Sequence, residues 1–90
     1  MSALSQVVSI DNKRGLHARA SAKFVNLASQ LPAAVEVAKD GQAVCGTSIM
    51  GLMMLGAAKG DSIEIRVQGD GAEQALAQLV ELVEGKFGEE

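Results

Sequence analysis

The sequence predicts an α+β domain in which helices cover one face of a single sheet, an open-faced sandwich. Segments of alternating or helically spaced apolar residues follow one another in the order β-α-β-β-α-β-α. The 90 residues are enough for one domain, so we expect residues 1–90 to form a single unit. Hydrophobic residues make up 48% of the chain and only two are aromatic, which predicts a small aliphatic core.

The first strand and the first helix flank a polar loop. One face of a strand over 4–10 is apolar, and a glycine-containing loop over 11–16 follows it. A helix over 18–30 comes next, and Pro32 ends it. The residues expected to face the core are Leu4, Val8 and Ile10 in the strand, and Ala20, Phe24, Leu27, Ala28 and Leu31 in the helix.

A hairpin follows. Strands over 34–39 and 42–46 are joined by Asp40-Gly41, a dipeptide typical of two-residue hairpin turns. The residues expected to face the core are Val35 and Val37 on the first of these strands, and either Val44 or the pair Ala43 and Cys45 on the second. For Cys45 we expect buried packing.

The second half holds a short helix, a strand and a long helix. The short helix lies within 47–56, with Thr47 or Ser48 as its cap and Gly56 at its end. The strand over 62–68 alternates cleanly. The last helix is expected to have Asp70 as its cap, with Glu73 three residues on, and residues 88–90 to form a frayed tail. Its apolar stripe consists of Ala72, Ala75, Leu76, Leu79, Val80, Val83 and Phe87.

The only histidine, His17, stands where the first helix begins. The first N–H groups of a helix have no internal partner and carry partial positive charge, so they can receive a phosphoryl group carried on the imidazole. Arg19 adds a guanidinium whose shape suits phosphate. A lone histidine is, however, more often an incidental surface or core residue.

Charge is distributed unevenly. The formal net charge is −3, yet residues 12–35 contain no Asp or Glu and four of the eight basic residues. This predicts a basic surface around the histidine that meets anions or acidic partners. The four basic residues are Lys13, Arg14, Arg19 and Lys23.

Several classes of protein are disfavoured. The few aromatic residues and the net charge argue against nucleic-acid binding. The chain shows no signal peptide and no apolar stretch of membrane-spanning length, and its single cysteine fits a reducing cytosol. We therefore expect a soluble, cytoplasmic monomer without metal or cofactor.

The short helix is too apolar for its length. One stripe can face the sheet, and the remaining side chains must either fill the core or meet partner proteins. We expect a partner-binding surface that also includes Lys23. Its helical members are Ile49, Met50, Met53 and Met54.

Two motifs carry a family resemblance. The residues at 15–19, Gly-Leu-His-Ala-Arg, resemble the active-site motif of HPr, the histidine-containing phosphocarrier of the phosphoenolpyruvate:sugar phosphotransferase system. Residues 48–56 resemble the regulatory-serine motif of the same family, at the usual separation. Length and element order match as well, so the resemblance covers nearly the whole chain. It implies a four-stranded antiparallel sheet covered by three helices.

The resemblance also implies a mechanism. His17 would accept a phosphoryl group on Nδ1 from phosphorylated enzyme I and pass it to EIIA-type proteins, with Arg19 assisting. Ser48 would be phosphorylated by HPr kinase/phosphorylase, which weakens transfer. Such a carrier has little chemistry of its own, because phosphoryl transfer depends mostly on positioning and charge stabilisation.

One departure and several alternatives remain open. The family often has proline after the arginine, where this chain has Ala20, so we expect a slightly looser helix start with an intact site. Some branches of the family (NPr-type) serve nitrogen-related regulation instead of sugar uptake. Outside the family, the alternatives are an acylphosphatase-like enzyme, for which Asn12 and Arg14 are a loose match, and a non-catalytic interaction domain.

Overall fold

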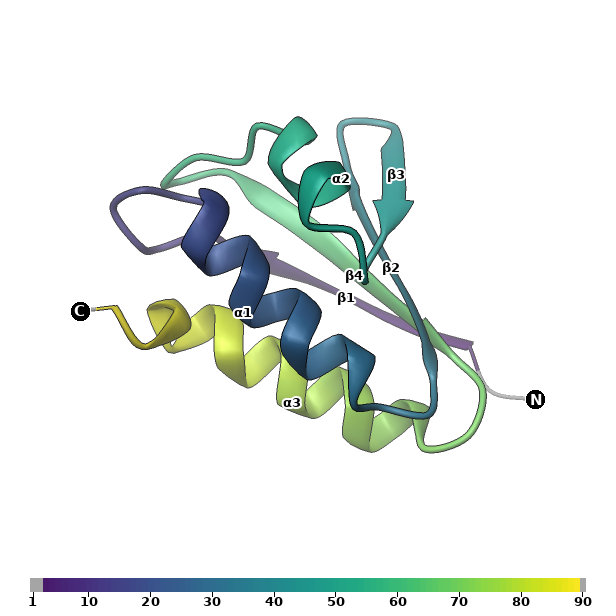
Figure 1. Cartoon of the computed structure of the whole chain (residues 1–90). Helices are drawn as coiled ribbons and strands as arrows, with labels where there is room; N and C mark the ends of the chain where they lie inside the picture. Colours follow the sequence, from purple (N-terminus) through teal and green to yellow (C-terminus); the bar gives the residue numbers. More distant parts are fainter. Residues whose placement is uncertain (1–2, 90) are drawn as a thin grey trace.

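The computed structural model describes residues 3–89, which form one four-stranded sheet with its helices on one face (Figure 1). All strand pairs are antiparallel, and the order across the sheet is β1-β4-β2-β3. The predicted fold class is therefore confirmed. The elements are β1 (Ala3–Ser9), α1 (Ala18–Ser29), β2 (Ala34–Lys39), β3 (Gln42–Cys45), α2 (Ile49–Met54), β4 (Ser62–Gln68), α3 (Ala72–Glu84) and a 3-10 turn, η1 (Lys86–Gly88).

Alternation explains the sheet. Every second residue of β4 is buried against the helices, and its outer residues are solvated. Strands β2 and β3 meet through Asp40 and Gly41, which both have positive φ, as the predicted two-residue turn requires. The neighbouring pair in the ladder is Lys39 opposite Gln42, so the turn sets the register of the hairpin.

The core lies between the sheet and the helices. Helix α1 buries one stripe, which includes Phe24, and α3 buries a second. The two helices lie side by side and run in opposite directions (Figure 1). Both phenylalanines are enclosed, Phe24 at 0% and Phe87 at 1% exposure. The remaining core residues are aliphatic, as the composition predicts.

Three local predictions are wrong. Cys45 is exposed, because Val44 is the residue of β3 that turns toward the core. Asp70 does not cap α3, since that helix begins at Ala72 and its N-cap is Gly71 in a left-handed conformation. Phe87 is buried, but it belongs to η1, because α3 ends at Glu84.

The expected frayed tail is also wrong where the structure describes it. Gly88 ends the turn η1, and Glu89 contacts the start of α1. Residue 90 lies outside the described residues. Within residues 3–89, no helix combines the length and apolar character needed to cross a bilayer.

Candidate functional site

His17 is the N-cap of α1, as its position in the sequence predicts. The loop before it is anchored by Gly15, whose positive φ brings the backbone close to residues 57–58. A Cβ on Gly15 would stand 2.3 Å from the carbonyl oxygen of Ala57, so only glycine fits there. The neighbouring Leu16 N–H donates to that same carbonyl at 2.9 Å. The loop is therefore held in place directly ahead of the histidine.

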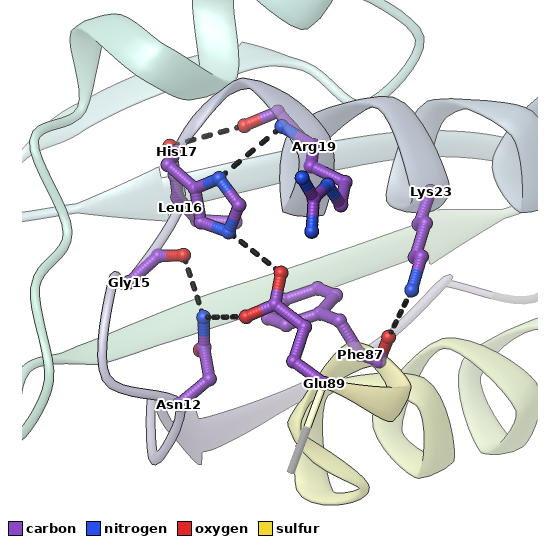
Figure 2. Close-up of polar contacts among 9 residues, drawn as sticks. Asn12, Gly15, Leu16, His17, Arg19, Lys23, Phe87 and Glu89 are labelled. Carbon is purple, nitrogen blue, oxygen red and sulfur yellow. Dashed lines mark hydrogen bonds and ion pairs between the residues drawn. The ribbon is translucent and has the colours of Figure 1, made fainter.

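The two ring nitrogens of His17 have different partners (Figure 2). Nδ1 faces the helix and accepts from the backbone N–H of Arg19 at 3.3 Å. Nε2 lies 2.6 Å from Oε2 of Glu89. A carboxylate accepts hydrogen bonds only, so Nε2 is the donor, and Nδ1 keeps its lone pair in the neutral ring. The side chain of His17 is 20% exposed, which leaves the ring accessible at the surface.

Glu89 and Asn12 complete the site. Neither was predicted from the sequence as a partner of His17. The buried Asn12 amide Nδ2 donates to the carbonyl oxygen of Gly15 at 2.8 Å and to Oε1 of Glu89 at 3.0 Å. Both neighbours are acceptors, so the NH₂ group must face them, and this leaves the buried Oδ1 of Asn12 without a partner among residues 3–89. Asn12 therefore ties the loop before His17 to the carboxylate that holds its ring.

The charge of Glu89 is favoured by its surroundings. Desolvation raises the pKa of this carboxyl, but hydrogen bonds from His17 and Asn12, together with electrostatic attraction first by His17 and then by Lys23, outweigh that effect. The pKa of Glu89 therefore lies below its ordinary value of 4.5, and the group is ionised near neutral pH. The charge around His17 is thus less positive than the basic residues of 12–35 alone predict.

Two of the four predicted cations, Arg19 and Lys23, have different surroundings in the structure. The guanidinium of Arg19 makes no hydrogen bond or ion pair with the described residues (Figure 2). Lys23, one turn further along α1, donates from Nζ to the carbonyl oxygen of Phe87 at 2.7 Å. Arg19 is therefore available to an anion, whereas Lys23 also fastens the turn that carries Glu89.

Ser48 and the apolar residues after it lie on α2, which contacts α1 (Figure 1). Ser48 is the N-cap of this helix, and its Oγ accepts from Gly51 N at 3.0 Å. Leu52 is fully buried beneath the helix. The other face is open to solvent, with Ile49 41%, Met50 72%, Met53 45% and Met54 72% exposed.

The site is a surface feature rather than a cavity. A groove of about 560 Å³ lies along β2, β3, β4 and residues 3–5, and His17 and its partners do not line it. No cluster of three His, Cys, Asp or Glu side chains that could hold a metal ion occurs within residues 3–89. His17 therefore lies on an open surface of the molecule, away from this groove.

Known proteins share this fold and this sequence. A family model described as "PTS HPr component phosphorylation site" matches residues 4–85. The phosphocarrier protein HPr of Neisseria meningitidis is 51% identical over 86 residues, covering 96% of this chain and 97% of that protein. A crystal structure of HPr from Thermoanaerobacter tengcongensis superimposes with a TM-score of 0.92 at 44% identity, covering 97% and 98% of the two chains.

The chain is a phosphocarrier, and it belongs to the HPr family of the phosphotransferase system. This membership replaces the two alternatives from outside the family, the acylphosphatase-like enzyme and the non-catalytic domain. The related branch is also represented: the phosphocarrier protein NPr of Shewanella violacea is 37% identical, covering 99% of this chain and 98% of that protein. A second T. tengcongensis structure, described as an HPr dimer, matches with a TM-score of 0.76 at 45% identity, covering 91% and 94% of the chains.

Proposed function

We propose that His17 is the phosphoryl-accepting residue of this carrier, that Nδ1 is the accepting atom, and that the donor is phosphorylated enzyme I. The observation that supports this most directly is the hydrogen bond from the Arg19 N–H to Nδ1 at the first turn of α1, which makes this nitrogen the one with the lone pair. A phosphoryl group bonded to Nδ1 would lie beside the first N–H groups of that helix, where anions are stabilised. The group then passes to EIIA-type proteins.

Arg19 assists the transfer in this proposal. Its guanidinium has no partner among residues 3–89 that would have to be displaced, and it projects from the turn that follows His17. Guanidinium binds phosphate oxygens in pairs and stabilises the charge that spreads over them during transfer. No metal or cofactor is needed on the carrier, since the partner proteins complete the site.

Partner proteins are proposed to dock on the open face of α2 together with Lys23 on α1. The four exposed residues, Ile49, Met50, Met53 and Met54, form an apolar patch next to the element that carries His17. Methionine side chains adapt to different surfaces, which suits a protein that must meet a donor and several acceptors in turn. We propose that the carrier works as a monomer in the cytoplasm, where its unpaired Cys45 fits reducing conditions.

Ser48 is proposed as a site of control by HPr kinase/phosphorylase. Its hydroxyl is part of the first turn of α2 and borders the apolar patch. Phosphate on this oxygen would suit the helix N-terminus and would place charge in the docking surface. Control at Ser48 depends on which partner proteins the cell supplies. So does the choice between sugar uptake, which we propose, and NPr-type nitrogen regulation.

The test is to incubate the protein with phosphoenolpyruvate and enzyme I and to record its ³¹P spectrum. We expect one phosphoryl group, labile in acid and stable in base, with the shift of an Nδ1-phosphohistidine. His17→Ala should carry no label while its circular dichroism stays native. It should lose about 1 kcal/mol of stability, because a helix cap is removed. Label on the wild type at any other residue would refute the proposal.

A further inference from the structure

The segment after α3 is built to deliver a carboxylate to His17. Lys86 and Phe87 both have positive φ, a conformation that side chains disfavour, and this reverses the chain toward α1. Two contacts hold the turn in that conformation. The ring of Phe87 is enclosed in the core at 1% exposure, and its carbonyl oxygen accepts from Lys23 Nζ at 2.7 Å. The position of Glu89 is therefore set by the packing of Phe87 and by the hydrogen bond from Lys23.

Both oxygens of the Glu89 carboxylate are engaged (Figure 2). Oε2 meets Nε2 of His17 at 2.6 Å, a short, charge-assisted contact. Oε1 accepts from the buried amide of Asn12 at 3.0 Å, and Asn12 is itself fixed to Gly15. The carboxylate is 12% exposed, so water competes little for it. The loop that carries Asn12 and the turn that carries Glu89 thus meet at the Nε2 edge of the imidazole.

We infer that Glu89 is a positioning residue for phosphoryl transfer: it keeps the proton on Nε2 and thereby leaves the lone pair on Nδ1. The inference rests on the proposed function of His17. It concerns a residue outside the matched range of the family model, which ends at residue 85. The hydrogen bond at one ring nitrogen decides which tautomer the other presents, as in catalytic triads, where a carboxylate orients the histidine.

The step balances without proton transfer. The Nδ1 lone pair forms the new N–P bond while the P–N bond of a phosphoramidate-type donor breaks, and the electron pair of that bond leaves with the donor nitrogen. Nε2 keeps its proton throughout, so the phosphorylated ring has cationic character. Glu89 lies at the far edge of the ring from Nδ1, where its charge stabilises that cation without meeting the dianionic phosphoryl group. On onward transfer the ring leaves as neutral imidazole.

The experiment separates this chemistry from partner docking by using phosphoramidate as a small-molecule donor. Glu89→Gln preserves shape and removes the charge. Glu84→Gln, on the exposed face of α3, is the matched control for loss of one negative charge. Two quantities are measured in each protein: the rate of His17 phosphorylation by ³¹P spectroscopy, and the ¹H–¹⁵N signal of His17 Nε2–H before any donor is added.

We expect Glu89→Gln to slow phosphorylation at least about tenfold, the lower end of the loss seen when a group that orients a metal-bound histidine is removed. The downfield Nε2–H signal should disappear through exchange or move upfield. Glu84→Gln should match the wild type in both measurements. An unchanged rate, an unchanged Nε2–H signal, or an equal loss of rate in Glu84→Gln would overturn the inference. A wild type that takes no label on His17 would refute the proposed function instead, and the Nε2–H signal would still report whether Glu89 holds the ring.

Discussion

His17 is placed by residues from three separate parts of the chain. Asn12 comes from the loop before it, Arg19 from the helix it caps, and Glu89 from the turn after α3. Each of the last two residues engages a different ring nitrogen, so the ring has a defined orientation and a defined tautomer. The proposed role of His17 as phosphoryl acceptor needs this, because a nucleophile reacts well only when it is held in the attacking geometry.

The Glu89 contact predicts a pH-dependent contribution to stability. The pKa of Glu89 is lowered in the folded protein, so its contribution is fully present above the unfolded value of 4.5 and is lost as pH falls through the folded pKa. Urea unfolding should therefore show Glu89→Gln to be less stable than the wild type at pH 7, and the difference should disappear as pH falls through the folded pKa of Glu89. Glu84→Gln should match the stability of the wild type at pH 7, so that no difference is left to disappear in acid. A difference that persists or grows in acid would contradict the assignment.

Local chemistry made part of the site predictable from sequence. His17 and Ser48 each stand directly before an apolar helix, where capping groups belong, and the structure places both as N-caps. Glu89 could not be found this way, because 72 residues separate it from His17 and its neighbours in sequence are glycine and glutamate. The one feature of the sequence that pointed to an ordered segment is Phe87, an apolar residue near the expected tail. Its ring is buried in the structure.

At the scale of single elements, periodicity predicted every α-helix and strand, but both limits of only two of them. Strands β2 and β4 have the predicted limits, because their alternation is uninterrupted and turns flank them. The errors occur where tertiary contacts decide. The exposure of Cys45 depends on which face of the short edge strand β3 turns inward, and a four-residue strand offers too little alternation to show it.

Helix α2 has a buried face and an exposed face, and Ser48, its N-cap, permits a test of the roles proposed for them. Ser48→Ala should lose about 1 kcal/mol of stability, because Gly51 N–H loses its acceptor. Ser48→Asp should keep its stability, since aspartate caps a helix as well as serine, but should bind enzyme I more weakly by calorimetry. If Ser48→Asp instead unfolds at far lower denaturant than Ser48→Ala, the assignment of Ser48 to docking control would fail.

The packing of the whole molecule holds the surface site in place. The sheet and the two long helices enclose both phenylalanines, and the short connections after β1 and after β3 bring His17 and α2 to neighbouring parts of the surface (Figure 1). In the proposed function no large cavity is needed, because each partner would bring its own half of the reaction site. The interfaces would then be small and short-lived, so that one carrier can leave its donor and reach an acceptor.

Docking and chemistry should therefore be separable in one variant. Met50→Gln combined with Met54→Gln changes two side chains that are each 72% exposed, so unfolding by urea should match the wild type. Phosphorylation by phosphoramidate should also be unchanged, because His17, Asn12 and Glu89 are untouched. Phosphorylation by enzyme I should slow about tenfold at low carrier concentration, equivalent to roughly 1.4 kcal/mol of lost docking.

The matched control is Leu52→Ala, which removes a side chain from the buried face of the same helix. It should lose about 2–5 kcal/mol of stability. While it remains folded, it should keep most of its rate with enzyme I, since the outer face of α2 is unchanged. If the methionine pair proved as destabilising as Leu52→Ala, or slowed phosphoramidate and enzyme I equally, the open face of α2 would be part of the folded core or of the reacting site. In neither case would it be the surface on which partners dock.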